Sequence, residues 1–578
     1  MQSAALLAVA LLVGQVTVQT QVTRVATPRD AAAYAAADLL QVLPADQPFQ
    51  RYVWFPQPSA AKAGALVYTL NTISSSTVPY RPTVLHKGAL IRLDLRGLAP
   101  RAEDLGRVRD VWEELALTNW YFGTIRQVQK VVTTETPQPD RTEVKAVWSG
   151  RQWVNQNVAV AQPAKVENTL QEVTTADFAL HTGMQNMLLL HSLTGQSKAP
   201  IIQGDQFLIT ALTVLDGGLY YRFLGITAST DPKKTDLDVF LERTGTRLED
   251  IQRLRSDQRI AMFRSGVTGK PRRIEFWNGS GVRPTVGAGL VTITSDIKDG
   301  NLNPRQHPIK SLASTQADAR ELIAMKPNGF LIFALFDGQG KLANEVPPDI
   351  AMDHTIEAPH TRRLEPGLSC IACHGPEDGF RKASNDVQKL LGAFKTESGW
   401  TRIQVLDDEA STEAVPETLE RIAGWFSGDA ELTAFRQARN DHHRAVYSVT
   451  GGLSSQALMG TLKDTRSTYR YGLVTPRVAC RELGYEAPSE TAAVNLFNQI
   501  VPFVPSNRFG IHTEDPVVAA LRAYNPADPI DIRRFEWETV YSDVMLRVVT
   551  KQTADRASAG ATSPATQERA SPLPGKGY

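Results

Sequence analysis

Cysteine is scarce in this chain, with three residues among 578. A framework of disulfides is therefore excluded, and a large hydrophobic core must stabilise the fold. The chain also lacks an excess of charge of either sign. It has 62 Lys and Arg and 61 Asp and Glu, which gives a formal net charge of +1, and it contains no basic block. This balance predicts neither a nucleic-acid partner nor binding to an anionic membrane surface.

Long hydrophobic runs are equally scarce. Ala4 to Gly14 is apolar and uncharged, and the first charge after it is Arg24. The run is shorter than the roughly 20 residues of a membrane span but has the length of a signal-peptide core. We expect residues 1–23 to be a signal peptide, although no Lys or Arg precedes the apolar run; a mis-assigned start or an uncleaved anchor are the alternatives. No transmembrane span is predicted after residue 14.

Several familiar catalytic motifs are absent. The chain contains no G-x-G-x-x-G, no P-loop, no H-E-x-x-H and no G-x-S-x-G. These patterns would indicate dinucleotide binding, phosphate binding, zinc proteolysis or serine hydrolysis. Their absence leaves enzyme activity open but does not favour a hydrolase or a transferase.

Two of the three cysteines fall in one pentapeptide, Cys370-Ile371-Ala372-Cys373-His374. At the observed numbers of cysteine and histidine, random placement gives about 3 × 10⁻⁴ such C-x-x-C-H runs, so chance does not account for it. The pattern is typical of covalent haem c attachment. Two intervening residues let one turn of chain place both sulfurs along one porphyrin edge, and the following imidazole becomes the proximal iron ligand. The sequence therefore predicts Cys370, Cys373 and His374 as haem-binding residues.

Two other interpretations of the motif are disfavoured. Structural zinc requires four ligands, usually with a second paired cluster, whereas the remaining Cys480 stands alone. A thioredoxin-like redox pair requires a strand before the motif and a helix that starts at the first cysteine. The preceding stretch, Leu364 to Ser369, is instead rich in turn-forming residues.

The residue opposite His374 decides what the iron can do. A methionine suits electron transfer, a second histidine gives a lower potential, and an open position permits ligand binding. We favour Met459, because a distal methionine usually follows the motif by several helices; His443, with its neighbour His442, is the alternative. Further candidates lie just upstream: Met352, His354 and His360.

The hydrophobic pattern predicts an α+β fold with a large mixed N-terminal region and a mainly α-helical, cytochrome c-like haem segment. Residues 30–350 form the α+β part, residues 351–550 the haem-binding part, and the Ala/Ser/Thr/Pro/Gly-rich residues 551–578 a disordered tail. Within these parts we expect helices at Ala60 to Ile73, Glu103 to Leu117, Asp177 to Leu193, Asn385 to Phe394, Glu417 to Phe426 and Glu490 to Ile500, strands at Leu90 to Arg96 and Gly329 to Phe336, and a hairpin turn at Asp337 to Gly340.

Several short stretches in the second half of the chain carry a resemblance. They are Lys326 to Gly329, Asp337 to Gly340, Pro347 to Ile350 with Asp353, and Gly367 to His374. In these the chain resembles a poorly characterised group of exported bacterial proteins with one cytochrome c-type haem motif after a large α+β region. Shorter and weaker similarities also occur upstream of these stretches, so the resemblance covers roughly residues 50 to 480. It implies haem binding and electron transfer, but neither a substrate nor the distal ligand.

The sequence thus predicts an exported c-type cytochrome with one haem c iron, located in the periplasm or elsewhere in the cell envelope. It would exchange electrons with a partner protein that the sequence does not identify. Two alternatives stay open. One is an envelope oxidoreductase whose haem relays electrons to a pocket in the N-terminal region, and the other is a haem-based sensor with an open distal site.

Overall fold

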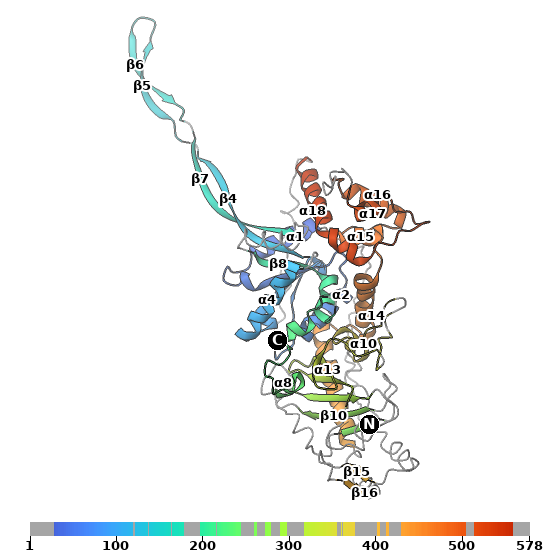
Figure 1. Cartoon of the computed structure of the whole chain (residues 1–578). Helices are drawn as coiled ribbons and strands as arrows, with labels where there is room; N and C mark the ends of the chain where they lie inside the picture. Colours follow the sequence, from blue (N-terminus) through green and yellow to red (C-terminus); the bar gives the residue numbers. More distant parts are fainter. Residues whose placement is uncertain are drawn as a thin grey trace, which may run out of the picture.

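The structure is a computed structural model (Figure 1). It describes residues 28–118, 122–136, 138–162, 164–178, 197–215, 217–243, 259–262, 272–278, 289–297, 317–348, 350–354, 356, 360, 362–375, 402–404, 412–414, 429–504 and 514–558. The expected signal peptide and the helices expected at 385–394 and 417–426 lie outside these residues. So does the helix expected at 177–193, apart from residues 177 and 178, which end a strand.

The first sheet has six strands in the order β2-β3-β1-β8-β4-β7. Its centre is β1, which pairs antiparallel with β3 and parallel with β8. All five residues of β1 are buried, so this strand runs through the core. The strands are β1 (Gln50–Trp54), β2 (Thr83–Leu85), β3 (Leu90–Asp94), β4 (Phe122–Thr136), β7 (Lys165–Phe178) and β8 (Ser197–Gln203). The strand expected from Leu90 is confirmed; it ends two residues early because a short helix begins at Leu95.

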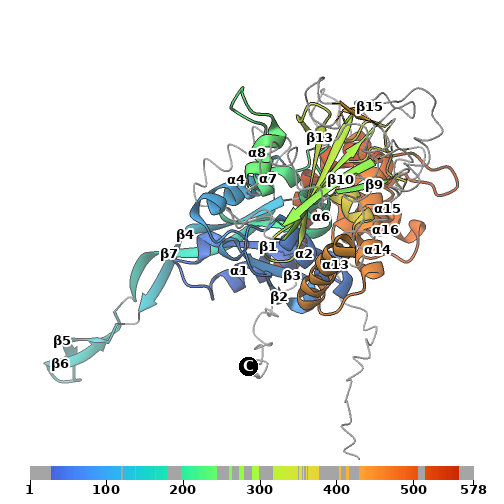
Figure 2. The same cartoon turned by 90° about the horizontal axis from the view of Figure 1, so that it is seen from below.

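Helix α2 (Ala60–Ile73) lies at the centre of the molecule, as Figure 2 shows. It starts where the Ser59 side chain accepts a hydrogen bond from the Lys62 amide, and it is buried from Gly64 onward. The helix expected over these residues is confirmed with the same bounds. Its neighbours come from both halves of the chain: α6 (Gly204–Leu212), α13 (Asp429–Thr450) and α14 (Ser455–Arg466) all contact it.

The second sheet also has six strands, each antiparallel to its neighbours, in the order β14-β13-β12-β11-β10-β9. Six of the seven residues of β13 (Leu331–Asp337) are buried. The expected hairpin is confirmed: the Gly340 amide donates to the Asp337 carbonyl, and β14 (Leu342–Ala343) pairs with β13. The other strands are β9 (Arg259–Met262), β10 (Arg272–Asn278), β11 (Leu290–Asp296) and β12 (Ala319–Met325).

The turn between β12 and β13 joins this second sheet to α2. The Lys326 ammonium is buried there and donates to the carbonyls of Asn71, Thr72 and Ser74 at 2.5, 2.7 and 2.8 Å. These carbonyls lie at the C-terminal end of α2, where a helix favours positive charge. Burial lowers the pKa of Lys326, whereas the three carbonyl contacts favour its charged form. The side chain of Asn328 adds a fourth hydrogen bond, to the Asn71 carbonyl.

Helices dominate the described residues after 350. One hydrophobic cluster runs from Ala31 to Val548, so these helices share a core with the N-terminal sheets. The fold is therefore α+β, as expected; the cytochrome c-like character of the segment stays a prediction. The helices are α10 (Leu368–Cys373), α13, α14, the π-helical turn η3 (Ser467–Tyr471), α15 (Pro476–Glu482), α16 (Glu490–Ile500), α17 (Pro516–Arg522) and α18 (Arg534–Ser558).

The C-terminal end of the fold requires one correction. Helix α18 continues to Ser558, so residues 551–558 are helical and do not begin the expected disordered tail. These eight residues contain neither glycine nor proline, and the first helix-breaking residue is Gly560. Residues 559–578 lie outside the described residues. Among the helices of the described part, none is long and apolar enough to cross a membrane.

Replacement of Lys326 by methionine tests the link between α2 and the second sheet. The variant keeps an unbranched side chain but leaves buried carbonyls without a donor, so we expect unfolding by denaturant to show a loss of about 1–3 kcal/mol. The matched control is Lys341→Met at an exposed position, where we expect a change within about 0.5 kcal/mol. Equal losses in the free energy of unfolding for the two variants would contradict a stabilising role of Lys326 at the end of α2.

Candidate functional site

The C-x-x-C-H motif lies on the short helix α10, which runs from Leu368 to Cys373 and has His374 as its C-cap. The chain enters this helix through Gly367, whose φ of 82° favours glycine. A Cβ at this position would lie 2.2 Å from the Leu212 carbonyl oxygen, so no larger residue fits. The His374 amide donates to the Cys370 carbonyl at 2.7 Å and closes the turn that holds the motif together.

The three motif side chains line one cavity of about 100 Å³. Its opposite wall belongs to the second sheet and includes Glu321 of β12. The Nε2 atom of His374 is 3.9 Å from Oε1 of Glu321, and the ring centres of His374 and Phe333 are 5.9 Å apart. The three residues predicted from the sequence lie together on one side of α10. They face a mixed wall that carries Glu321 and the largely buried Arg272–Asp296 ion pair beside apolar side chains such as Leu335 and Phe336.

The electrostatics of Cys370 do not suit thiol–disulfide chemistry. Only 2% of this residue is exposed. Burial raises the pKa of its thiol well above the ordinary value, and the nearby Glu321 and Cys373 raise the pKa further. A redox-active cysteine needs a lowered pKa and access to solvent. Moreover, α10 starts two residues before Cys370 instead of at it, which further disfavours the thioredoxin-like interpretation.

Two features of the site show how well a haem would fit there: the set of donor atoms and the volume of the cavity. Two thiols separated by one helical turn and an adjacent imidazole form the donor set of a c-type haem, and this set fits. The cavity of about 100 Å³ is smaller than the roughly 300–1,000 Å³ of cofactor sites. The space between α10 and the second sheet is therefore smaller than a whole haem needs, and most of the macrocycle would have to lie outside this cavity. Within the described residues, no group of three or more His, Cys, Asp or Glu is arranged to hold a metal ion.

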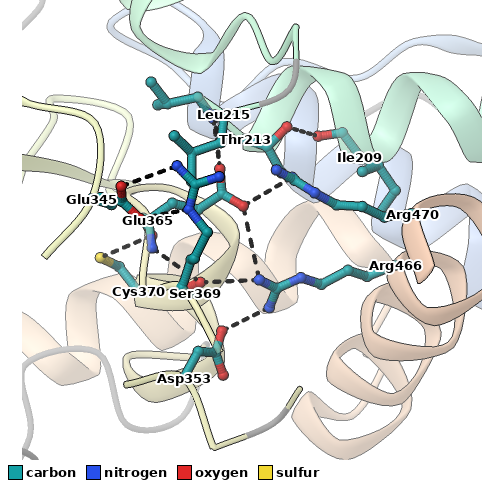
Figure 3. Close-up of polar contacts among 12 residues, drawn as sticks. Ile209, Thr213, Leu215, Glu345, Asp353, Glu365, Ser369, Cys370, Arg466 and Arg470 are labelled. Atoms are coloured by element: carbon teal, nitrogen blue, oxygen red, sulfur yellow. Dashed lines mark hydrogen bonds and ion pairs between the residues drawn. The ribbon is translucent and has the colours of Figure 1, made fainter. Parts of the chain in front are cut away.

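A buried carboxylate holds α10 in place, as Figure 3 shows. Glu365 lies five residues before Cys370 and is 1% exposed. One of its oxygens accepts hydrogen bonds from the backbone amides of Val214 and Leu215, both at 3.0 Å. The other lies 2.9 Å from Nη1 of Arg470. Glu365 therefore joins the loop after α6 and the turn η3 to the segment that carries the motif.

Arg466 extends this buried network (Figure 3). Its guanidinium lies 2.7 Å from a carboxylate oxygen of Asp353 and 3.8 Å from Glu365, and it donates to the Ser369 hydroxyl at 3.3 Å. Ser369 directly precedes Cys370. Sequence analysis assigned no role to Glu365, Arg466 or Arg470. The four-residue spacing of the two arginines indicates a shared helix face, but nothing local indicates their partners.

The favoured distal candidate, Met459, lies near the motif but on another side of α10. Its Sδ atom is 3.5 Å from the position that a Cβ on Gly375 would take. It lines a second cavity of about 520 Å³, together with Leu368 and Ala372 of α10. His360 borders the same cavity and stacks on Tyr471 with ring centres 4.8 Å apart.

The other distal candidates lie elsewhere. His442 is fully buried on α13, where its Nδ1 atom lies 2.8 Å from the Gly329 carbonyl oxygen. Burial lowers the pKa of His442 to about 4, so its ring is neutral at pH 7. His443 is exposed on the same helix. Neither histidine lines the 100 Å³ or the 520 Å³ cavity. Met352 and His354 are exposed as well.

Comparisons with known proteins add nothing to this geometry: no family model, no curated protein and no solved structure matches the chain.

Substitution of Glu365 by glutamine tests the buried network. It removes the negative charge and leaves two buried arginines short of a partner, so we expect a loss of about 3–5 kcal/mol in denaturant unfolding. The control is Glu345→Gln, since Glu345 forms a bidentate pair with Arg363 that is about one third exposed. There we expect a loss of less than about 1 kcal/mol. A Glu365→Gln protein as stable as the control would rule out a central role for this carboxylate.

Proposed function

We propose that this protein is an exported c-type cytochrome with one covalently attached haem, acting in electron transfer. The observation that carries the proposal is the C-x-x-C-H motif, whose two thiols and imidazole all line one cavity. Cys370 and Cys373 would hold the haem through thioether bonds, and His374 would ligate its iron. When bound, the haem supplies a one-electron redox couple.

The residues around the motif would adjust the reduction potential of the haem. A carboxylate increases the basicity of a ligating imidazole when it accepts a hydrogen bond from the ring nitrogen that does not bind the metal. Glu321 lies on the Nε2 side of His374, the side on which the iron would bind, so its negative charge would act on the iron itself and not through the other ring nitrogen. Phe333 and the other apolar side chains of β13 limit the access of water, which also shifts the reduction potential. The second sheet thus supplies the wall of the haem site, and the Glu365 network fixes the helix that carries the motif.

A second candidate function is supported by the 520 Å³ cavity on the other side of α10. Its volume is within the range of small-molecule sites. A cavity of this size beside the motif would suit the substrate pocket of a haem-dependent envelope oxidoreductase. A haem-based sensor with an open distal position is the other alternative. The distal ligand separates the alternatives: Met459, or His443 or His442 in its place, gives a six-coordinate iron suited to electron transfer.

Cysteine variants test the attachment. We expect the wild-type chain, produced together with a cytochrome maturation apparatus, to retain haem staining after denaturing electrophoresis. The double variant Cys370→Ala/Cys373→Ala should lose the stain, because both thioether bonds are gone. The matched control is Cys480→Ala, which removes the buried third cysteine and should stain like the wild type. Staining of the double variant at the wild-type level would refute the attachment sites.

Substitution of Met459 tests the distal ligand. With Met459 bound to iron, Met459→Ala should open the sixth position and allow carbon monoxide to bind the reduced protein, which the wild type should resist. The control Met352→Ala changes an exposed methionine and should leave the reduced-minus-oxidised spectrum unchanged. A wild-type protein that binds carbon monoxide readily would favour the sensor or oxidoreductase function.

A further inference from the structure

A long β-ribbon projects from the body of the molecule (Figures 1 and 2). Strands β4 and β7 pair along fourteen positions, and beyond them the hairpin of β5 (Arg141–Trp148) and β6 (Trp153–Val160) forms the end of the arm. The hairpin is a two-stranded sheet, so the outer edge of each strand lacks a neighbouring strand within the described residues. None of its sixteen strand residues is buried.

The hairpin concentrates exposed apolar side chains. Of sixteen large hydrophobic residues exposed in the described part of the chain, five lie on these two strands: Val144, Val147, Trp148, Trp153 and Val154. Trp148 and Trp153 are 54% and 69% exposed, and their rings contact each other edge to face at 5.6 Å. This cross-strand pair stabilises the hairpin. The outer edges of β5 and β6 remain able to form hydrogen bonds with a further strand.

The turn determines which backbone groups point outward. The Ser149 amide donates to the Gln152 carbonyl at 3.0 Å, so these two residues form a hydrogen-bonded pair. Because such pairs alternate along an antiparallel ladder, Trp148 opposite Trp153 is a non-hydrogen-bonded pair. By the same alternation, the amides and carbonyls of Thr142, Val144 and Ala146 point to the free edge of β5.

The charges of β5 are complementary to those of a second β5 strand. When two copies run antiparallel with Val144 opposite Val144, Thr142 faces Ala146, and the outward backbone groups meet as hydrogen-bonded pairs. In this register Glu143 of each copy faces Lys145 of the other, at non-hydrogen-bonded positions where side chains approach closest. Across its own hairpin, Glu143 faces Val158 and Lys145 faces Gln156. The two charged side chains approach each other along β5 only at 3.9 Å and neither is buried, so they stay accessible to a second copy.

We propose that the arm mediates self-association: the β5 edges of two copies pair antiparallel about Val144 and join two hairpins into a four-stranded sheet. The proposal goes beyond electron transfer and does not depend on haem. A membrane is a poorer fit for the arm, because the polar turn with Arg151 lies beyond the tryptophan pair and would have to enter the apolar layer first.

Charge reversal in the full-length protein tests the register. The wild type should sediment as a dimer in analytical ultracentrifugation. Glu143→Lys and Lys145→Glu should each raise the dimer dissociation constant by about tenfold or more, because both symmetric contacts become repulsive. A mixture of the two variants should form a heterodimer, and the double variant Glu143→Lys/Lys145→Glu should dimerise like the wild type.

The control for net charge is Arg151→Glu, at the turn and outside the paired register, which should leave the dimer intact. A wild type that is monomeric, or single variants that dimerise as tightly as the wild type, would overturn the proposal. Failure of the mixed variants to associate would also overturn it. Binding of the wild-type monomer to phosphatidylcholine vesicles, lost on Trp148→Ala/Trp153→Ala, would instead assign the arm to a lipid surface.

Discussion

The position of the C-x-x-C-H motif depends on one buried carboxylate, Glu365. Removing a charged group from water costs several kcal/mol unless partners replace the water. Here two backbone amides and two guanidinium groups do so, and they come from segments about 150 residues before and about 100 residues after the carboxylate. Helix α10 cannot shift without breaking several of these contacts together. The motif is therefore held by long-range electrostatics, because α10 itself is only six residues long.

A second long-range contact determines what faces the motif. Lys326 binds the C-terminal carbonyls of α2, and α2 in turn contacts the helices that follow the motif. Through this connection the second sheet lies against α10, with Glu321 and Phe333 beside His374. The large N-terminal region thus has a structural role at the site, because it forms one wall of the cavity and shares a single core with the C-terminal helices.

Local signals in the sequence predict the local structure. The bounds of α2 and α16 follow from hydrophobic periodicity and serine caps, and the β13–β14 hairpin follows from an apolar strand before Asp337 and Gly340. The motif itself is a pentapeptide. What sequence analysis missed is long-range: the partners of Glu365 and Lys326 lie roughly 100 to 250 residues away. The length of the β4–β7 ribbon was also missed, because its polar, threonine-rich strands resemble loops.

The most direct test of the account is the intact mass of the purified full-length protein, produced outside the cytoplasm with a working cytochrome maturation apparatus. Covalent attachment at Cys370 and Cys373 predicts a coloured protein whose mass exceeds that of its polypeptide by one haem, retained under denaturing conditions. A colourless protein with the mass of the bare chain would contradict the central claim that Cys370 and Cys373 carry a covalent haem.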